Sequence, residues 1–374
     1  MSHLSSDLLQ RTRQAVSNAG RLRRKPQSLI QSGDTPYDVI FQEGIVSLRY
    51  YPPLDTDSIE VEGESVAVAS HTYRTPILLV PPLAVTLALY DLFPDRSLVK
   101  YLRARGFEVY LIDWGEPGWQ QNHFDLAHYF ADWVPQLIKR VREHSGERKL
   151  TLHGWSFGGL FSYCAAALGD PDIANLVLVG APCDYHANGR LGRYYQRLSR
   201  VLTGAENLMG FRIHDTRKRW WRSPGWANSL AFKLTNPVAH VQNFGALVRN
   251  LHDEDYVSNH ATLNAFINGM LAYPGGVIQD TLAYLLKENV LARGQLPMEG
   301  GEGSLGRIRA SVLLTCGRSD EIVTEDCAKA LLDQVSSSDT KVLRVPGGHM
   351  GILSGSKAPA QIWPEWVEWL SERS

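Results

Sequence analysis

A serine flanked by glycines is the residue of this chain that most clearly predicts chemistry. The apolar run at residues 149–153 leads into Gly154-Trp-Ser156-Phe-Gly158, and helical spacing of apolar residues follows from 157 to 168. The pattern G-x-S-x-G between a strand and a helix places a serine on a strained turn, and glycines leave room there that side chains would fill. The N–H groups that open the helix then point at the reacting centre. We therefore predict that Ser156 is a nucleophile.

An acid is expected after Ser156 in the chain, because this fold orders its triad as serine, carboxylate, histidine. Asp320 follows the apolar run at residues 311–315, in the turn where the carboxylate that orients the base belongs. Glu321 is one residue farther along and is expected to face away. Asp184, just past the apolar run at 176–179, is the alternative acid. Asp320 is the acid that we predict.

A base must accept the serine proton, because a serine hydroxyl is inert at neutral pH without one. His349 stands in the loop Val-Pro-Gly-Gly-His-Met-Gly at residues 345–351, after the last apolar run of strand type. The glycines of this loop allow it to reach over the edge of the sheet toward Ser156. His349 is therefore the predicted base.

An oxyanion hole needs two N–H donors. The N–H of Phe157, directly after the nucleophile, is the first predicted donor. The second is expected in the loop after the apolar run at 77–81, where Leu83 is our choice and Ala84 is the alternative. Pro81 and Pro82 have no N–H to offer.

The elements around these residues alternate between strand and helix patterns, which predicts an α/β fold with a mostly parallel sheet covered by helices. A hairpin is predicted at 37–50, and a mostly helical block interrupts the alternation. We therefore expect an α/β-hydrolase fold with an inserted cap over the carboxyl edge of the sheet. The predicted divisions are a basic N-terminal arm at 1–36, a first core part at 37–182, the cap at 183–305 and a second core part at 306–374. The predicted strands are 77–81, 108–113, 149–153, 176–179, 311–315 and 341–345, and the predicted helices are 97–105 (or from 95), 126–141, 157–168, 325–334 and 362–370.

The composition excludes several classes of function. The chain has 374 residues, 44% of them hydrophobic, and a formal net charge of −1, which gives no reason to expect a nucleic-acid partner. No apolar stretch approaches 18 residues, so neither a membrane-spanning helix nor an export signal is expected, and we predict a cytoplasmic protein. The four cysteines show no C-x-x-C pair and no metal-ligand spacing. We expect buried free thiols, no cofactor and no metal ion.

Two basic segments leave alternatives open. The N-terminal 26 residues carry six Arg and Lys residues and a helical spacing of apolar residues. They could bind a membrane, a lipid surface or a partner, but a frayed, solvated helix is the interpretation that we favour. Residues 217–222, Arg-Lys-Arg-Trp-Trp-Arg, could face a lipid or a polymer, but a partly buried cap segment with solvated arginines is favoured. Three tryptophans could line an acyl tunnel or belong to the core: Trp114, Trp119 and Trp155.

Several motifs resemble polyhydroxyalkanoate synthases, most closely the catalytic subunit of the class III enzymes. They are residues 75–82, 90–97 and 109–115, the turn around Ser156, residues 318–323 and residues 347–349. The resemblance covers roughly residues 36 to 355 and is weaker in the cap. It implies polymerisation of 3-hydroxyacyl-CoA thioesters through a covalent acyl-enzyme, with Asp320 and His349 at the family's acid and base positions. It also implies an acyl thioester or acyl-CoA substrate, a homodimer or a second subunit, and association with polymer granules or a lipid surface.

The chain departs from that family at its nucleophile, which is cysteine in the family and Ser156 here. An acyl-serine is an oxygen ester, which is less activated for chain elongation than a thioester. Residues 83–86, Leu-Ala-Val-Thr, also replace the family's Val-Asn or Ile-Asn-like segment. Three hypotheses follow: an acyltransferase acting through acyl-Ser156, a serine hydrolase (esterase, thioesterase or polyester depolymerase) with water as acceptor, and a non-catalytic partner or scaffold subunit.

Overall fold

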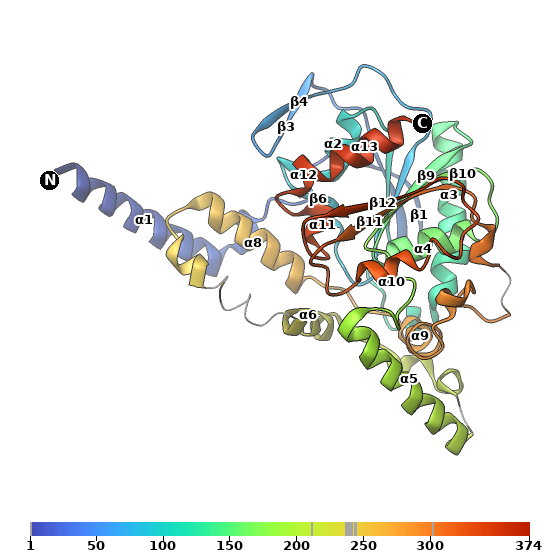
Figure 1. Ribbon diagram of the computed structural model, residues 1–374. Helices are drawn as coiled ribbons and strands as arrows, with labels where there is room; N and C mark the ends of the chain where they lie inside the picture. The colour runs from blue at the N-terminus through green and yellow to red at the C-terminus, as the bar shows by residue number, and fades with distance from the viewer. Residues whose placement is uncertain (1, 211, 236–241, 243–244, 301–302) are drawn as a thin grey trace.

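The computed structural model describes residues 2–210, 212–235, 242, 245–300 and 303–374. Its centre is an eight-stranded sheet in the order β1-β2-β8-β5-β9-β10-β11-β12 (Figure 1). β2 runs antiparallel to β1 and to β8, and every other neighbouring pair is parallel. The strands are β1 (Asp38–Glu43), β2 (Val46–Tyr51), β5 (Ile77–Val80), β8 (Val109–Asp113), β9 (Leu150–Trp155), β10 (Ile173–Val179), β11 (Ser311–Gly317) and β12 (Thr340–Val345).

Helices cover both faces of this sheet, because the side chains of each central strand alternate between two apolar clusters. In β5, Leu78 and Val80 belong to the cluster that contains α3 and α4, whereas Ile77 and Leu79 belong to the cluster that contains α2 and α13. All four side chains are fully buried. The core helices are α2 (Leu98–Ala104), α3 (Val134–Ser145), α4 (Phe157–Ala166), α10 (Glu325–Lys329), α11 (Gly351–Ser354), α12 (Ala358–Gln361) and α13 (Trp363–Ser371).

The predicted fold class, a mostly parallel sheet covered by helices, is confirmed. Differences are confined to short elements. Ser97 rather than Asp95 caps α2, because its side chain accepts the N–H of Lys100. The helix predicted at 325–334 is regular only in α10. Two small hairpins were not predicted, β3 (Ser58–Val61) with β4 (Glu64–Ala67) and β6 (Asp91–Phe93) with β7 (Arg96–Ser97). Short helical turns complete the core at Leu87–Tyr90, Gln120–His123, His128–Trp133 and Leu305–Arg307.

Helices dominate the described residues between β10 and β11. They include α5 (Gly189–Met209), α6 (Gly225–Thr235), α8 (Glu254–Asn268) and α9 (Gly275–Asp280). Figure 1 shows α5, α6 and α9 gathered at one end of the core, whereas α8 extends outward beside α1. Short turns join them: η5 (Ile213–Asp215), η6 (Lys218–Trp221), η7 (Thr281–Lys287) and η8 (Val290–Arg293). We call the described part of 183–305 the cap.

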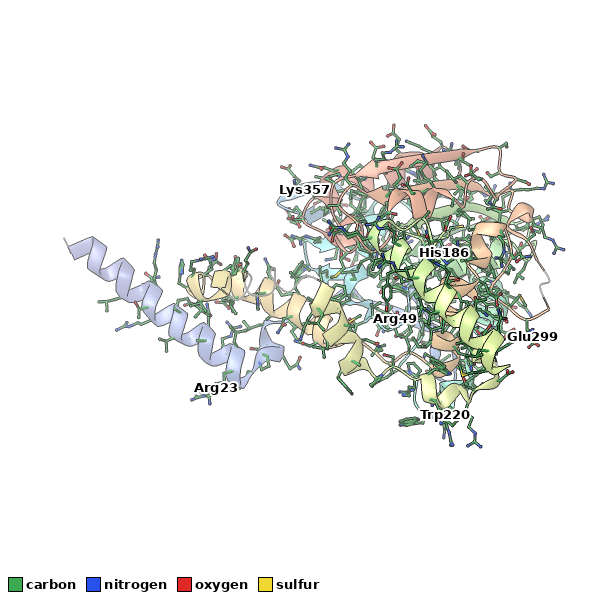
Figure 2. The ribbon with its side chains drawn as sticks, turned by 60° about the horizontal axis from the view of Figure 1, so that its bottom comes forward. Arg23, Arg49, His186, Trp220, Glu299 and Lys357 are labelled. Atoms are coloured by element: carbon green, nitrogen blue, oxygen red, sulfur yellow. The ribbon has the colours of Figure 1, made fainter. Side chains whose placement is uncertain are left out.

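The N-terminal arm forms a docked helix rather than the frayed, solvated helix that we favoured from the sequence. α1 (Ser2–Arg24) and the turn Pro26–Leu29 pack against α8, and both figures show them projecting together from the core (Figures 1 and 2). Asn18 is fully buried there and donates to the carbonyl oxygen of Leu251 over 2.9 Å. Arg21 forms an ion pair with Glu254. No helix among the described residues is long and apolar enough to cross a bilayer.

Candidate active site

Ser156 lies on the sharp turn between β9 and α4, in a strained backbone conformation. Its φ is 55° and its ψ is −124°, a backbone conformation that residues other than glycine rarely adopt. Both flanking glycines are sterically required. A Cβ on Gly154 would lie 2.4 Å from the carbonyl oxygen of Gly158, and a Cβ on Gly158 would lie 1.9 Å from that of Val80. The turn therefore presents the Ser156 hydroxyl at the end of β9.

His349 bridges Ser156 and Asp320, which the chain separates by more than 160 residues. Its Nε2 lies 2.9 Å from the Ser156 Oγ, and its Nδ1 lies 2.8 Å from an Asp320 Oδ2. The carboxylate of Asp320 is fully buried, and the imidazole is 8% exposed. The structure thus joins the three predicted residues in one chain of hydrogen bonds. This arrangement allows a proton to pass from a serine oxygen to an imidazole beside a buried carboxylate.

Asp320 is held in place by its own turn. Its Oδ1 accepts the N–H groups of Ile322 and Val323, each over 2.9 Å, which leaves Oδ2 for His349. The alternative acid, Asp184, has a different role: its Oδ1 accepts the N–H of His186 over 2.9 Å and the side-chain amide of Asn289 over 2.7 Å. Asp184 therefore shapes a loop of the cap, away from the hydrogen bonds of His349.

Two further residues position His349, and the sequence analysis did not assign them this role. The indole N–H of Trp155 donates to the carbonyl oxygen of His349 over 3.0 Å, and the two rings lie 5.3 Å apart. Gly180 ends β10 with a φ of +54°, and a Cβ there would lie 3.2 Å from the imidazole Nδ1. Any side chain at position 180 would crowd the base. The Gly-Ala-Pro sequence after β10 is the signal that could have indicated this role.

The loop that follows β5 carries Leu83, the predicted second oxyanion donor, and Ala84, its alternative. Both are buried, and the N-terminus of α4 packs directly on the start of this loop at Val80 and Pro81. Ala84 has a φ of +62°, which is costly for a residue with a Cβ. Its carbonyl oxygen accepts the N–H of Leu271 from the cap over 3.0 Å. The cap is therefore bonded to the loop in which we predicted the second donor.

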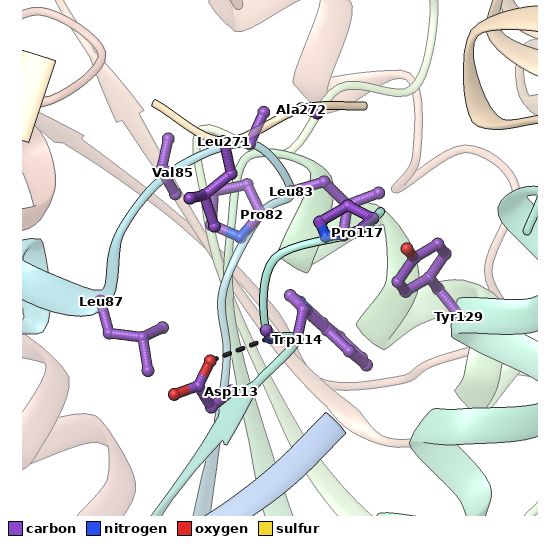
Figure 3. Close-up of a pocket in the computed structure, with 12 residues that line it drawn as sticks. Pro82, Leu83, Val85, Leu87, Asp113, Trp114, Pro117, Tyr129, Leu271 and Ala272 are labelled. Carbon is purple, nitrogen blue, oxygen red and sulfur yellow. Dashed lines mark hydrogen bonds between the residues drawn. The ribbon is translucent and has the colours of Figure 1, made fainter. Parts of the chain in front are cut away.

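A small cavity of about 20 Å³ lies between this loop and the cap (Figure 3). Apolar side chains make up most of its wall, among them Leu83, Trp114, Tyr129 and Leu271. A larger, more polar cavity of about 350 Å³ shares Val85, Leu87, Asp113, Gly115 and Leu271 with it. The two cavities are thus neighbours across the same loop.

The three tryptophans considered as tunnel residues have three different environments. Trp114 is buried at the small cavity, and its indole N–H donates to the carbonyl oxygen of Pro81 over 2.9 Å. Trp155 packs against His349, as described above. Trp119 is 73% exposed. Only Trp114 therefore lines a cavity beside the loop of Leu83.

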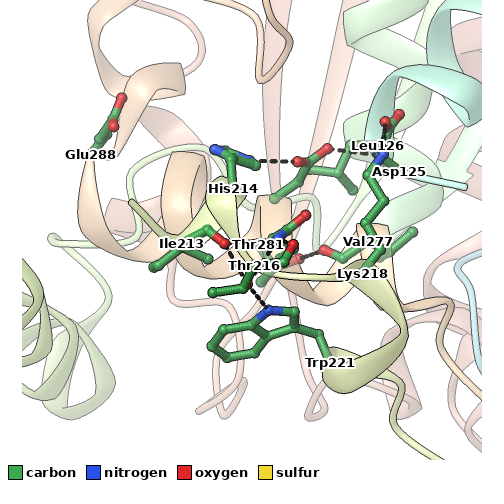
Figure 4. Close-up of polar contacts among 12 residues, drawn as sticks. Asp125, Leu126, Ile213, His214, Thr216, Lys218, Trp221, Val277, Thr281 and Glu288 are labelled. Carbon is green, nitrogen blue, oxygen red and sulfur yellow. Dashed lines mark hydrogen bonds and ion pairs between the residues drawn. The ribbon is translucent and has the colours of Figure 1, made fainter. Parts of the chain in front are cut away.

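Buried carboxylates attach the cap to the core (Figure 4). Asp280 of α9 accepts the backbone N–H of Leu126 over 3.0 Å and lies 2.9 Å from the Nε2 of His214. Burial raises the pKa of Asp280 despite these hydrogen bonds. Lys218 of the cap donates to Asp125 of the core over 2.8 Å. Burial alone would raise the pKa of Asp125, but the hydrogen bonds of His128 and Lys218 bring that pKa below its ordinary value. The cap is thereby fixed to the core helix that begins near Leu126.

The cysteines are buried, as predicted: Cys164, Cys183, Cys316 and Cys327. Burial raises the pKa of Cys316 and of Cys327 to about 12, so both thiols are protonated at neutral pH. Within the described part of the chain, no group of three or more His, Cys, Asp or Glu side chains could hold a metal ion.

Comparisons with known proteins agree with this fold. A family model described as the alpha/beta hydrolase fold matches residues 76–356. The poly(3-hydroxyalkanoate) polymerase subunit PhaC of Haloferax mediterranei is 28% identical over 371 residues, which cover 99% of this chain and 70% of that protein. The subunit of the same name from Allochromatium vinosum is 28% identical over 347 residues, or 92% of this chain and 90% of that protein. The resemblance to polyhydroxyalkanoate synthases, including those of class III, is thereby confirmed.

Among solved structures, a soluble variant of the monoglyceride lipase of Saccharomyces cerevisiae has a TM-score of 0.53 and 15% identity. The match covers 92% of this chain and 96% of that one. At this identity the likeness concerns the fold alone.

Proposed function

The chain belongs to the alpha/beta hydrolase fold family and is an enzyme of acyl-transfer or hydrolytic type, and on that premise we propose that it transfers 3-hydroxyacyl groups from a thioester through an acyl-Ser156 intermediate. The observation that carries the proposal is the chain of hydrogen bonds Ser156–His349–Asp320. The thioester donor is proposed because relatives named as polymerase subunits resemble the chain over most of its length.

In the first half of the proposed reaction, the Ser156 Oγ attacks the thioester carbonyl carbon while His349 Nε2 takes the hydroxyl proton. For this, the neutral imidazole carries its proton on Nδ1, and this N–H donates a hydrogen bond to Asp320. The charge of the Asp320 carboxylate then stabilises the imidazolium. The N–H groups of Phe157 and Leu83 stabilise the oxyanion. The carbon–sulfur bond breaks, and the thiolate leaves with the proton that His349 returns.

In the second half, an acceptor hydroxyl attacks the ester carbonyl of acyl-Ser156. His349 removes the acceptor's proton and returns a proton to the Ser156 Oγ as the ester bond breaks. A hydroxyacyl acceptor extends a chain, whereas water releases a free hydroxy acid. The likeness to relatives named as polymerase subunits supports the first acceptor, and that reaction requires that water be kept from the acyl-enzyme.

A hydrolase is the second candidate function, and the serine at the nucleophile position favours it. An acyl-serine holds its acyl group as an oxygen ester, which is less reactive toward a hydroxyl acceptor than the thioester formed by a cysteine. A serine also requires a base to be activated, and His349 lies within hydrogen-bond distance of the Ser156 Oγ.

Product analysis with 3-hydroxybutyryl-CoA and a longer 3-hydroxyacyl-CoA tests the proposal. Wild type, Ser156→Cys and Ser156→Ala are compared for CoA release, free acid and polymer. If the site is built for chain growth, Ser156→Cys raises the polymer yield, because a thioester intermediate replaces the oxygen ester. Ser156→Ala is the control for uncatalysed hydrolysis of the thioester and should release almost no CoA.

Two results would contradict the acyl-transfer proposal. Free hydroxy acid as the sole product of both wild type and Ser156→Cys would leave the hydrolase. If the wild-type protein releases no CoA and does not react with a fluorophosphonate probe, the remaining hypothesis is a non-catalytic scaffold subunit.

A further inference from the structure

Three tryptophan side chains stand in solvent at one edge of the cap. Trp119 is 73% exposed, Trp220 is 67% exposed and Trp226 is 72% exposed. Tryptophan is on average a highly buried residue, so three exposed indoles on neighbouring segments call for an explanation. Figure 2 shows Trp220 projecting outward from this edge, clear of the ribbon.

Arginines contact two of these tryptophans, and the third, Trp226, follows Arg222 by four residues. The guanidinium of Arg222 lies 5.2 Å from the centre of the Trp119 ring, and it donates to the carbonyl oxygens of Pro117 and Gly118 over 2.6 and 2.8 Å. The guanidinium of Arg217 lies 5.9 Å from the centre of the Trp220 ring. We define the tryptophan–arginine patch as Trp119, Arg217, Arg219, Trp220, Arg222 and Trp226.

The turn that carries the patch is anchored from below. Trp221 points inward, where its indole N–H donates to the Thr216 Oγ1 over 2.6 Å, and Lys218 is bonded to Asp125. These two contacts leave Trp220 and Arg219 on the outer side of the same turn. The segment 217–222 is therefore partly buried on the cap side, and Arg217, Arg219 and Trp220 are exposed.

Part of the positive charge of the patch is not neutralised by a carboxylate in the described part of the protein. Arg217 and Arg219 are exposed, and neither forms an ion pair with a described carboxylate. Two neighbouring carboxylates have other partners: Asp215, two residues before Arg217, accepts the N–H of Arg212, and Asp125, which lies beside Lys218, is bonded to Lys218 and His128. The patch thus offers unpaired cations beside exposed indoles.

We propose that the tryptophan–arginine patch binds the surface of a lipid bilayer that contains anionic phospholipid. Indole rings settle at the headgroup layer, where one part of the ring is apolar and the N–H is hydrated. Arginines beside them are attracted to anionic headgroups. The patch projects on turns, and its residues line neither of the two cavities described above. Such a surface fits a lipid bilayer better than a folded acidic protein, because a fluid bilayer needs no complementary shape. This inference is independent of the proposed acyl transfer.

Co-sedimentation of the full-length protein with vesicles tests it. The vesicles are phosphatidylcholine alone or phosphatidylcholine with about one-third phosphatidylglycerol, each at low and high salt. The variants are Arg217→Ser/Arg219→Ser, Trp220→Ser/Trp226→Ser and, as a charge-matched control, Arg105→Ser/Lys357→Ser. Arg105 and Lys357 are exposed on the core, and Figure 2 shows Lys357 far from Trp220. CoA release in solution is measured for each variant and should stay unchanged.

Wild type should bind the anionic vesicles, and high salt should weaken this binding. The arginine pair should lower the partition coefficient about 25-fold, at roughly fivefold for each arginine. The tryptophan pair should lower it at least about tenfold, because the apolar contact with the headgroup layer is lost. The control pair should stay within about twofold of wild type, since its charges lie beyond the screening length.

An equal loss of vesicle binding in the control variant Arg105→Ser/Lys357→Ser would overturn the proposal. So would a wild-type protein that does not bind anionic vesicles. Wild type that binds poly-glutamate but no vesicle would equally overturn it and indicate an acidic protein partner instead.

Discussion

On one side of Ser156, the hydrogen bonds that hold His349 and Asp320 come from residues of the core, and the cap adds hydrogen bonds between Asn188 and the adjacent residues Ile322 and Thr324. On the other side, the loop of Leu83 and Ala84 is itself bonded to the cap. Trp155 and the turn at 320–323 fix the first side through hydrogen bonds within the core. The second side depends on the N–H of Leu271, which reaches across from the cap.

This difference suggests a division of labour. The hydrogen bonds of His349 and Asp320 themselves are formed within the core, while the loop of the proposed donor Leu83 is bonded directly to the cap through Ala84. Ala84 stores backbone strain in that loop, and such strain persists only where surrounding contacts hold it. We therefore expect changes on the two sides to differ both in size and in kinetic signature.

The largest effect is expected at the nucleophile itself. Ser156→Ala should lower kcat by more than about 10⁴-fold and abolish fluorophosphonate labelling, because no other group can form the acyl-enzyme. Turnover assays and intact-mass spectrometry measure both. Ser338→Ala, at an exposed serine, is the control. Activity above a few per cent of wild type in Ser156→Ala would refute the assignment.

A smaller but still large effect is expected at the acid. Asp320→Asn should lower kcat about 10³- to 10⁴-fold with the fold intact, because the amide no longer fixes the His349 tautomer or stabilises the imidazolium. Asp184→Asn, whose carboxylate bonds only to its own loop and to Asn289, should be mild. If the Asp184 variant is the inactive one, the wrong acid has been chosen.

On the oxyanion side, Leu271→Pro removes the N–H that the Ala84 carbonyl accepts. This change should lower kcat by about tenfold, less than the 10²- to 10³-fold loss that follows removal of an oxyanion donor, because the donor is displaced rather than deleted. Leu271→Ala keeps the N–H and should stay near wild type. Steady-state kinetics are measured together with thermal unfolding. Two results would contradict a role for the hydrogen bond between Leu271 and Ala84: a loss of kcat in Leu271→Pro that is explained by global unfolding, or an equal loss of kcat in Leu271→Pro and Leu271→Ala.

A stability effect is expected from His153, which lies in β9, three residues before Ser156. Its ring is fully buried, and neither nitrogen has a hydrogen-bond partner among the described residues. Burial lowers the pKa of His153 from 6.5 to about 4. Above pH 6.5 the ring is neutral in both states. As the pH falls from 6.5 to about 4 only the unfolded chain takes up the proton, so the free energy of unfolding falls by at most about 3 kcal/mol.

The variant His153→Phe tests this, because a phenyl ring fills a similar volume and does not titrate. Urea unfolding at pH 7.5 and at mildly acidic pH should show a smaller acid-induced loss of stability for the variant than for wild type. Identical pH dependence in the two proteins would show that His153 does not titrate across this range.

The smallest effect, close to none, is expected from thiol reagents. Iodoacetamide should leave activity largely intact, because all four thiols are buried and burial raises the pKa of the one nearest Asp320, Cys316, to about 12. Residual activity is followed over time with and without substrate. Rapid inactivation that substrate prevents would instead indicate an accessible Cys316.

The sequence alone predicted the α/β fold class, which is confirmed, and it selected Ser156, Asp320 and His349, whose side chains the structure brings into one chain of hydrogen bonds. Each of these rests on local signals: apolar runs that end in turns, glycines at sites of close approach, and the chain order of the three residues. Short-range physics dictates such signals, because strand and helix periodicities and turn conformations depend on a few neighbouring residues.

The tertiary structure alone decided the contacts that support the site. The bond from Trp155 to His349 spans 194 residues along the chain, and the one from Leu271 to Ala84 joins the cap to the core. The docking of α1 on α8 through Asn18 is of the same kind. No local sequence pattern predicts these contacts, because they form between segments that meet only once the sheet and cap have packed. Proximity in space then determines which partner forms the hydrogen bond to a buried polar group.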